Sequence, residues 1–481
     1  MKLTGTIYFA AALISVVCLA GCMVGPDYER PQTAADGADG FVHAPHGWAD
    51  SNDIETAGWW KRFSDPVIDE LVAEALENNT DLKIAAARVL ESEALLKQSH
   101  GIRLPDVSYS ADRTRSKSSF TLADTRLSFI SQNYSQSLSV SYIVDFFGKL
   151  KRSERAAMSD LLSTRAGQKA LIHSVVARVV ASRVQIASLQ RQLDIARQNT
   201  ATWQQTQEIV QRRYNAGLVS SLDIYRTGEN LAAAEAAEPA LERSLAIAAH
   251  GLDVLLGRRA GTSAKLAQTL PDLPGMEPVP IALPAALLDQ RPDVIEAELK
   301  LAAGTERIGV SIAEMYPDLT LSAAGGYSAN RFKMLTEPES QIWSSMISLA
   351  APVFKGGRLK AGVAAAEARA TQARAAYAGV VLRALGEVED ALVSEKMFRQ
   401  RLELLQRRLQ QARKSESLGR QRYVDGLERL LVVLDTQRRR QIAEVELVRI
   451  KNELFNNRIN LFLAIGGDWQ IDLKQKQEGL N

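Results

Sequence analysis

The sequence contains very little cysteine and little proline. Its only two cysteines among 481 residues are Cys18 and Cys22, near the N-terminus, so the rest of the chain holds neither a disulfide nor a thiolate metal site. Only 15 prolines occur, which permits long helices. A net charge of +2 argues against a strongly basic nucleic-acid-binding protein. Hydrophobic residues make up 46% and charged residues 24%, a globular balance that argues against a polytopic helical membrane protein.

The motifs of common catalytic sites are also missing. No GxxxxGK, HExxH or GxSxG pattern occurs, and of the five histidines only His43 and His46 are close together, in a linker rich in small residues. We therefore predict no enzyme, no catalytic residue, no metal and no cofactor. A surface-anchored enzyme on a helical stalk is the alternative, and it would need a cluster of convergent polar groups that the sequence does not display.

The N-terminal sequence is typical of a secretory signal peptide. Residues 7–20 are almost entirely apolar but too short for a comfortable transmembrane helix. The following Leu19-Ala20-Gly21-Cys22 resembles a bacterial lipobox. That resemblance implies removal of residues 1–21, a diacylglycerol and acyl chain such as palmitate on Cys22, and, since residue 23 is Met, sorting to the outer membrane.

An internal duplication sets the architecture. The segment from Leu104 to Ala111 matches the segment from Tyr316 to Ala323 at an offset of 212 residues. Gly148-Lys-Leu150 matches Gly357-Arg-Leu359 at 209, and Arg213-Tyr-x-x-Gly-Leu218 matches Arg422-Tyr-x-x-Gly-Leu427 at the same offset. Ordered matches at nearly one spacing predict two structural repeats per chain.

Each repeat contains one very long helix. Residues 150–214 and 358–423 are both free of proline, and a helix of that length spans on the order of 100 Å. No compact globule holds such a helix, so it must lie in a coiled coil or a tube. The heptad spacing of Ile172, Val175, Val179, Ile186 and Leu189 fits either arrangement, including a soluble coiled-coil dimer.

Four alternating segments favour the tube. Residues 107–111, 135–144, 318–327 and 343–353 place apolar side chains on one face and mostly Ser or Thr on the other. This pattern is typical of membrane β-strands around a wet lumen, although a pair of soluble hairpins would show it too. A membrane sheet must close, and four strands are fewer than the roughly eight of the smallest known barrels. Strands must therefore be shared between chains, and three chains supply twelve.

The ordered motifs resemble a known family. Cys22-Met-Val-Gly-Pro-Asp-Tyr-Glu-Arg-Pro31, the WWxxFxDP segment from Trp59, Arg291-Pro-Asp293 and the segment Pro352-Val-Phe-Lys-Gly-Gly-Arg358 are similar to those of TolC-like outer membrane efflux factors, in the OprM/NodT lipoprotein branch. The resemblance covers essentially the whole mature chain. It implies an α+β membrane protein, a homotrimeric channel-tunnel with a shared 12-stranded transmembrane β-barrel and a long periplasmic α-helical barrel.

The resemblance also implies a function and partners. We expect the outer membrane channel of a tripartite efflux system, which passively conducts small molecules such as drugs and toxic organics. Its partners would be a periplasmic membrane-fusion adaptor, an inner-membrane transporter of the RND type, and outer membrane lipids, with no nucleic acid. Two alternatives stay open, a type I protein-secretion duct and a periplasmic coiled-coil scaffold lipoprotein without a pore.

The predicted sites lie where the long helices turn back. By resemblance, the two turns form the adaptor-docking surface at the periplasmic tip, with residues Arg213, Tyr214, Gly217, Leu218, Arg422, Tyr423, Gly426 and Leu427. Both glycines also fit ordinary helix C-caps. By the same resemblance, Leu431, Asp223 and Asp435 form the periplasmic gate, where threefold copies of them would ring the bore, although the acids also fit exposed helix positions. We interpret Arg438–Arg440 either as an exposed, solvated helix face or as ion-pair partners of Asp435.

We divide the chain accordingly. Residues 1–21 are the signal peptide and 22–80 a lipidated linker and equatorial segment. The first repeat covers 81–270, with strands at about 105–147, and the second covers 293–467, with strands at about 317–355. A proline-rich connector at 271–292 joins the repeats, and 468–481 form a tail.

Overall fold

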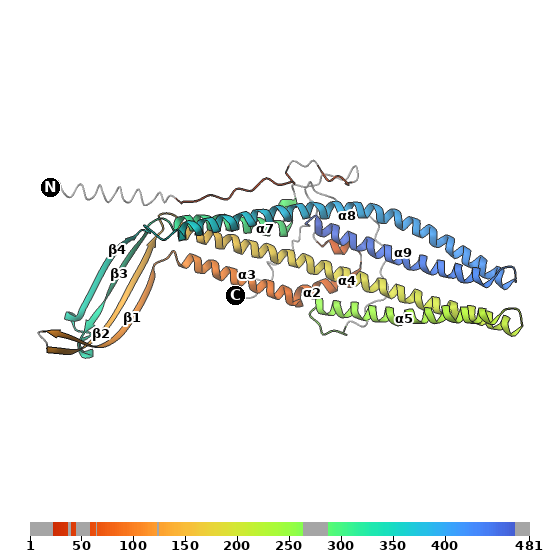
Figure 1. The fold of residues 1–481 in the computed structure, drawn as a ribbon, viewed down its shortest axis with the longest axis horizontal. Helices are drawn as coiled ribbons and strands as arrows, with labels where there is room; N and C mark the ends of the chain where they lie inside the picture. The colour runs from red at the N-terminus through yellow and green to blue at the C-terminus, as the bar shows by residue number, and fades with distance from the viewer. Residues whose placement is uncertain are drawn as a thin grey trace. The chain divides into compact units, whose positions relative to one another are not determined.

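The computed structural model describes residues 23–36, 40–44, 58–63, 65–122, 125–262 and 287–466. The predicted signal peptide, the predicted acylation site Cys22, the predicted connector as far as residue 286 and the tail lie outside these residues. The elements, in chain order (Figure 1), are η1 (Trp59–Phe63), α2 (Pro66–Asn78), α3 (Thr80–Gly101), β1 (Asp106–Leu122), β2 (Thr125–Val144), α4 (Lys149–Asn215), α5 (Ser221–Leu255), α6 (Leu287–Gln290), α7 (Pro292–Ala313), β3 (Asp318–Ala329), η3 (Phe332–Met334), η4 (Pro338–Ser340), β4 (Gln341–Ala350), α8 (Arg358–Val424) and α9 (Leu430–Ala464).

The chain forms two units, each assembled from separate stretches. The first contains Arg88–Arg165, Glu296–Tyr377 and the N-terminal stretch to Pro31, and therefore holds all four strands. The second contains Gln32–Ala87, Ala166–Ile295 and Ala378–Asn481. The long helices α4 and α8, of 67 residues each, contribute to both units.

The four strands make one antiparallel sheet in the order β1-β2-β3-β4. The two repeats meet where β2 pairs with β3, with Leu138 opposite Gly325 and Tyr142 opposite Leu321. At Gly326 a Cβ atom would lie 2.0 Å from the carbonyl oxygen of Gln136, so only glycine allows the strands to approach this closely.

The register keeps the two faces of the sheet chemically distinct. One row across all four strands holds Tyr109, Leu138, Gly325 and Trp343. The adjacent row on the other face holds serine pairs, and Ser108 and Ser139 are hydrogen-bonded at 2.8 Å. The apolar row is exposed, with Trp343 at 79%, so the sheet presents a hydrophobic face that nothing else in the described chain covers.

The strands of the first hairpin are longer than the sequence pattern predicts. β1 has 17 residues and β2 has 20, whereas the alternating segments in the sequence cover only residues 107–111 and 135–144. Beyond Ala111, the β1 positions on the apolar face become Arg113, Arg115 and Lys117. The charged residues end the apolar alternation while the backbone ladder continues, and the ladder is what defines a strand.

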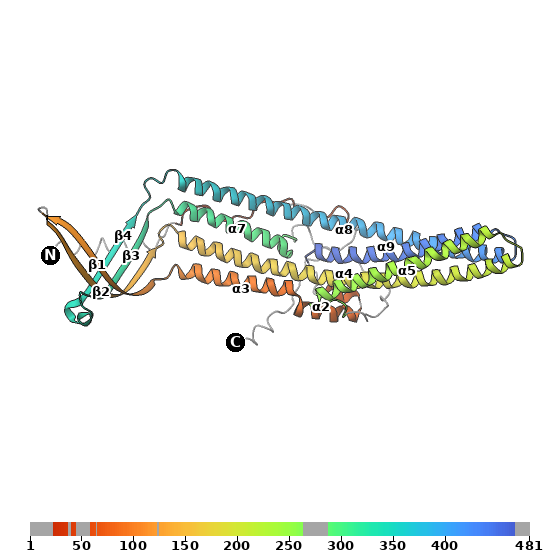
Figure 2. The ribbon, with the colours of Figure 1, turned by 60° about the horizontal axis from the view of Figure 1, so that its bottom comes forward.

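In the first unit, helices adjoin the sheet ends. Figure 2 shows α3, α4, α7 and α8 side by side. Hydrogen bonds link neighbours: the hydroxyls of Ser92 on α3 and Thr164 on α4 lie 3.1 Å apart, and Ser163 on α4 donates to the carbonyl oxygen of Glu296 on α7 at 3.1 Å. Gly304 on α7 lies against Ala370 on α8, where a Cβ atom would stand 3.6 Å from the Ala370 Cα.

The N-terminal segment of the first unit is clamped to α4 and α7. Arg152, only 1% exposed, donates to the carbonyl oxygens of Gly25 and Pro26, both at 3.0 Å, and to Glu306 at 2.9 Å. Tyr28 donates to Glu298 at 3.0 Å. Three elements thus converge on one buried guanidinium, and burial of such a charge is costly unless it is paired.

Glycines make this clamp possible. Gly25 has a φ of 96°, and a Cβ atom on it would lie 2.6 Å from the Cα of Gly309 on α7. Gly148 has a φ of 74°, and a Cβ atom on it would lie 2.4 Å from the Cγ of Met23. Met23 is therefore fixed beside the loop that joins β2 to α4.

The second unit is organised around aromatic residues from both ends of the sequence. Trp59 is 1% exposed and stacks on Phe462 of α9 with ring centroids 5.2 Å apart, while Phe63 packs on Phe455. Asp65 pairs with the buried Arg183 of α4 at 3.3 Å. The WWxxFxDP motif is therefore a packing motif that joins the N-terminal segment to α4 and α9.

The RPD motif has a comparable role. Arg291 donates to the carbonyl oxygen of Ala464 at 2.9 Å, to Asp293 at 2.8 Å and to Glu387 at 2.7 Å. Burial opposes ionisation of Asp293, but the hydrogen bonds and charge of Arg291 outweigh it and lower the pKa of that carboxyl. The motif thus ties the start of α7 to α8 and to the end of α9.

Candidate functional site at the two helix turns

The two RYxxGL turns have the same backbone structure. Gly217 and Gly426 have φ values of 73° and 75°. In the first turn Leu218 N–H donates to the Arg213 carbonyl oxygen at 2.9 Å, and in the second Leu427 N–H donates to that of Arg422 at 2.8 Å. These are Schellman motifs, which end a helix with a left-handed residue. A Cβ atom added to either glycine would meet no other atom within 4 Å, so the backbone conformation alone requires glycine here.

The side chains of the two turns differ despite the identical motif. Tyr214 is 43% exposed, whereas its counterpart Tyr423 is 4% exposed. Leu218 and Leu427, at 67% and 69%, are both open to solvent. The structure thus places most of the predicted docking residues on the surface and places Tyr423 inside.

Arg213 of the first turn covers Tyr423 of the second. Its guanidinium donates to the carbonyl oxygen of Tyr423 at 2.5 Å and lies 4.6 Å from the centre of the tyrosine ring. Burial raises the pKa of Tyr423, and the neighbouring Arg213 only partly opposes this. Arg213 and Tyr423 therefore join the α4–α5 hairpin to the α8–α9 hairpin, which Figure 2 shows side by side at their turns.

Polar contacts and a small hydrophobic core support this junction. The fully buried Gln437 of α9 donates to Thr206 of α4 at 2.9 Å, and Arg420 of α8 donates to Gln205 of α4 at 3.2 Å. The core beneath the turns contains Trp203, Val210, Tyr423, Leu430, Val433 and Leu434. The two hairpins are thus joined by a few specific contacts above a shared core.

The predicted gate residues lie near the starts of α5 and α9, with Asp223 and Leu431 on the first turns and Asp435 one turn further along α9. Leu431 is 63% exposed, beside the buried Leu430, and Asp223 is partly exposed. Asp435 accepts from Arg439 at 2.6 Å and from Arg438 at 3.3 Å. The hydrogen bond from Arg439 lowers the pKa of Asp435, so this acid is charged at neutral pH.

The third arginine of that run behaves differently from its neighbours. The side chain of Arg440 is 12% exposed and pairs with Glu416 of α8 and Glu444 of α9, each at 2.5 Å. It also donates to Asn199 of α4 at 3.0 Å. Burial raises the pKa of Glu416 although Arg440 opposes this. Sequence reasoning missed this network, because neither acid is adjacent to Arg440 in the chain; the four-residue step to Glu444 was the available signal.

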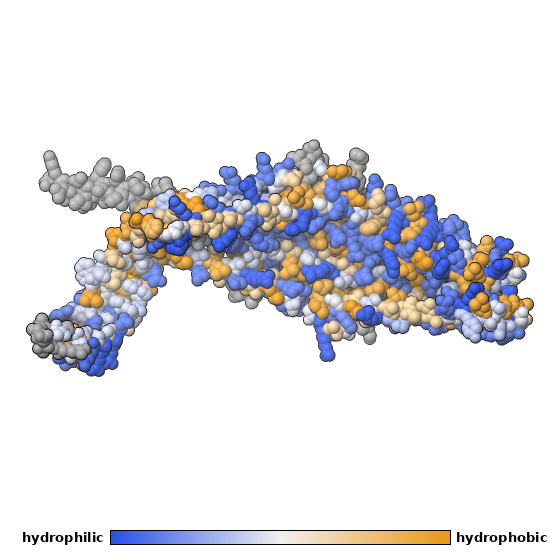
Figure 3. All heavy atoms as spheres, viewed as in Figure 1, coloured by the Kyte–Doolittle hydropathy of each residue, from blue (hydrophilic) through white to orange (hydrophobic). Residues whose placement is uncertain are grey.

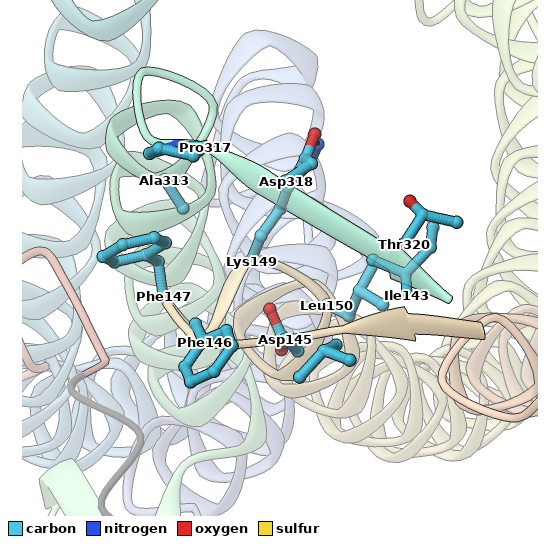
Figure 4. A pocket seen from close by; sticks show the side chains of 11 residues that line it. Ile143, Asp145, Phe146, Phe147, Lys149, Leu150, Ala313, Pro317, Asp318 and Thr320 are labelled. Carbon is cyan, nitrogen blue, oxygen red and sulfur yellow. Dashed lines mark hydrogen bonds and ion pairs between the residues drawn. The ribbon is translucent and has the colours of Figure 1, made fainter. Parts of the chain in front are cut away.

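A small pocket lies where the strands become helices in the first unit (Figure 4). Its volume is about 90 Å³, and it is lined by residues that include Ile143, Phe146 and Leu150, with Lys149 paired to Asp318 at 3.3 Å. Small-molecule sites usually measure about 300–1,000 Å³. The pocket is therefore much smaller than a typical site for a small-molecule cargo.

Comparisons with known proteins agree with this architecture. The family model described as "Outer membrane efflux protein" matches residues 71–258 and 283–467. The toluene efflux pump outer membrane protein TtgF of Pseudomonas putida is 30% identical over 471 residues, which cover 96% of this chain and 97% of TtgF. Outer membrane protein OprJ of Pseudomonas aeruginosa is 29% identical over 469 residues, covering 95% of each chain.

Among solved structures, the outer-membrane channel OprN superposes with a TM-score of 0.86 at 29% identity, covering 93% of this chain and all of OprN. The predicted fold class, a trimeric channel-tunnel with a shared barrel and a periplasmic helical part, is confirmed. So are the predicted location in the bacterial outer membrane and the role as an efflux channel component, which is not a class of enzyme. The chain belongs to the outer membrane efflux protein family.

Proposed function

We propose that the chain forms a non-catalytic duct for small apolar molecules, delivered by an inner-membrane transporter of the RND class through a periplasmic adaptor. The observation that carries the substrate class is the end-to-end similarity to a toluene efflux channel protein, at 30% identity over 96% of the chain. The sheet supports a wet duct, because its serine face lies opposite its apolar face where all four strands pair.

The adaptor-docking surface consists of the exposed turn residues. Leu218, Leu427, Tyr214 and Arg422 present apolar and cationic groups at the ends of two helix hairpins. Arg213 and Tyr423 support this surface from beneath, because they fix one turn against the other. A partner that contacts both turns therefore senses whether the hairpins are joined.

The gate is the first part of α9 with its hairpin contacts. Leu431 closes the bore by apolar contact with its symmetry copies, and Asp435 adds a ring of charge. The contacts Arg213–Tyr423 and Gln437–Thr206 hold α9 in the closed position. Opening requires these contacts to separate, and adaptor binding to the turns supplies the free energy.

The chain is anchored in the membrane through an acyl chain on Cys22 as well as through the barrel. The clamp at Gly25 and Arg152 supports this, since it fixes Met23 beside the loop between β2 and α4. That loop directly follows a strand of the membrane sheet, so the lipid enters the leaflet that faces the periplasm. Two attachments of different kind give stable anchoring where one acyl chain does not.

Planar-bilayer recordings of the purified full-length protein test the duct. A pore gives discrete conductance steps, whereas a scaffold lipoprotein gives none. Docking is tested separately by toluene tolerance of cells in which this chain replaces their own efflux channel. Leu427→Asp should abolish tolerance while leaving conductance unchanged. Val42→Asp, at a side chain that is 86% exposed and distant in sequence from the turns, is the matched control and should leave both unchanged. Equal tolerance in both variants would remove Leu427 from the docking surface.

A further inference from the structure

The outward face of the first hairpin changes character along its length. On β1 the residues of the apolar face are Val107, Tyr109 and Ala111, and two residues further come Arg113, Arg115 and Lys117. The other face of β1 keeps Ser108, Ser110, Asp112 and Thr114. All three cations therefore lie on the face that contacts lipid lower in the sheet, and none lies on the serine face.

The opposite face changes in the reverse sense. Past Ser131 the serine face of β2 carries Phe129 and Leu127, which are 52% and 44% exposed. If the hairpin simply extended into water, neither face would need a fixed polarity. The exchange of an apolar for a cationic outer face marks the level at which the strands leave the hydrocarbon.

Aromatic residues occupy that same level. Tyr109, Trp343 and Tyr327 lie on the apolar face in neighbouring rows, followed by Tyr134. Aromatic side chains of this kind form the girdle at the boundary between hydrocarbon and headgroups. Arg113 lies with its guanidinium 5.5 Å from the centre of the Tyr134 ring, so the cations begin where the girdle ends.

The β3–β4 loop adds an exposed aromatic residue to this site. Phe332 is 72% exposed, and its ring packs against Tyr134 with centroids 5.7 Å apart. Because Tyr134 is on the outward face, Phe332 is fixed there too. An aromatic group and a guanidinium thus flank one tyrosine, which suits a ligand with an acyl part and an anionic headgroup.

The three cations form an unneutralised stripe. Successive members stand roughly 7 Å apart, because a strand rises about 3.3 Å per residue. Within the described residues no carboxylate lies within ion-pair distance of Arg113, Arg115 or Lys117, and all three are exposed. The facing β2 positions from Tyr134 to Ser128 are uncharged. Three exposed like charges held in a line on one face are well placed to bind an anionic partner with several charges.

We infer that Arg113, Arg115 and Lys117, with Tyr134 and Phe332, form a binding surface for the phosphate-bearing headgroups of outer-leaflet glycolipids. The hydrophilic end of the sheet is visible in Figure 3. The site rests on the outer membrane location of the chain and not on its cargo, its gate or its adaptor. The lipid phosphates pair with the cation stripe, and the acyl chains lie against the aromatic girdle.

Binding of fluorescent, phosphate-retaining lipopolysaccharide to the purified full-length trimer in detergent tests the inference. Replacing all three cations by Gln should weaken binding about 100-fold, since each Lys or Arg near an anionic lipid surface contributes about fivefold. The control replaces Arg243, Arg407 and Lys414 by Gln, which removes the same charge from exposed helix positions and should leave binding unchanged. Equal losses in both variants would mean a non-specific charge effect and would overturn the site.

Two further measurements keep the test decisive. Adding Thr114→Arg to the triple variant puts one cation back on the serine face and should not restore binding. Lipopolysaccharide from which the phosphates have been removed should bind the wild-type trimer as weakly as the intact lipid binds the triple variant; equal binding of both lipids to wild type refutes the proposal. Arg115→Gln alone, with an expected fivefold loss, serves if the triple variant does not form trimers. Bilayer conductance should be unaffected throughout, so failure here leaves the duct intact.

Discussion

Replacing Arg440 by Met should loosen the α8–α9 hairpin without touching its turn. The substitution keeps most of the side-chain volume but removes the charge that lies between Glu416 and Glu444. It also deletes the hydrogen bond to Asn199 of α4, so one change affects three helices. The two carboxylates that it leaves behind are 15% and 11% exposed.

The size of the effect follows from the pairing. Removing one partner of a buried ion pair costs about 3–5 kcal/mol, because the other charge is left in a poorly solvated position. Arg413 continues to donate to Glu444 at 2.9 Å, which compensates one of the two acids. We therefore expect a loss of about 3 kcal/mol in the local opening free energy, near the low end of that range. At about 1.4 kcal/mol per tenfold change, amide exchange should accelerate about 100-fold.

Hydrogen exchange of the full-length trimer measures this directly in peptides that span residues 436–448. The control is Arg439→Met, because Arg439 is 71% exposed and pairs with Asp435 at the surface. An exposed pair contributes so little that exchange in this control should change about fivefold at most. If the two variants accelerate exchange equally, the buried network is not what holds the hairpin.

The pH dependence gives a second check. The folded pKa of Glu416 is raised by burial, so its charged form is disfavoured and its protonated form is favoured as pH falls. Without Arg440 that pKa should rise further. The ratio of variant to wild-type exchange rates should therefore be smaller at about pH 5 than at about pH 7.5. Adding Glu416→Gln to Arg440→Met removes the same charge without a change of pH, so it should also lower this ratio. A ratio that does not change with pH would contradict this explanation.

Four further predictions are accessible. Gly426→Ala should destabilise the second turn by about 1 kcal/mol, because the φ of Gly426 is 75°. Gly379→Ala, in the interior of α8, should instead stabilise the helix by about 0.5–1 kcal/mol. The trimer melting temperature should therefore fall in the first variant and rise in the second. Leu431→Ser should raise single-channel conductance, and an unchanged value would remove this residue from the gate. Cys22→Ser should abolish incorporation of labelled fatty acid while the barrel still inserts, and labelled mutant protein would refute acylation at this residue. Burial lowers the pKa of His173 to about 3, so trimer stability should decline as pH falls from about 6.5 toward 3, and His173→Gln should flatten this decline in melting curves.

The duplication, the long helices and the strand faces could be predicted from sequence because they depend on local periodicity. The heptad positions Val175 and Val179 are indeed fully buried. The neighbouring Val176 and Val180 are buried as well, so α4 packs on more than the single seam that the heptad pattern suggests. A heptad pattern predicts burial of one face of a helix, whereas a helix that packs against several neighbours buries more than one face.

The chemistry of the turns could not be predicted to the same depth. Identical RYxxGL motifs lead to an exposed Tyr214 and a buried Tyr423, because burial depends on which hairpin lies against which side chain. The same reason hid the Arg440 network, whose partners lie 24 residues before it on α8 and far away on α4. Glu298 is comparable: it accepts from Tyr28 and Arg30, some 270 residues earlier, which only the fold brings together.

The difference between the two turns has a consequence for assembly. A trimer of a duplicated chain carries six helix turns with one backbone structure, which alone would suggest sixfold equivalence. The side chains reduce this to threefold alternation, since an open tyrosine and a sequestered one follow each other around the ring. Any protein that binds all six turns must therefore accommodate two different binding surfaces. It can do so by making different contacts at each type of turn, or by binding one type of turn before the other.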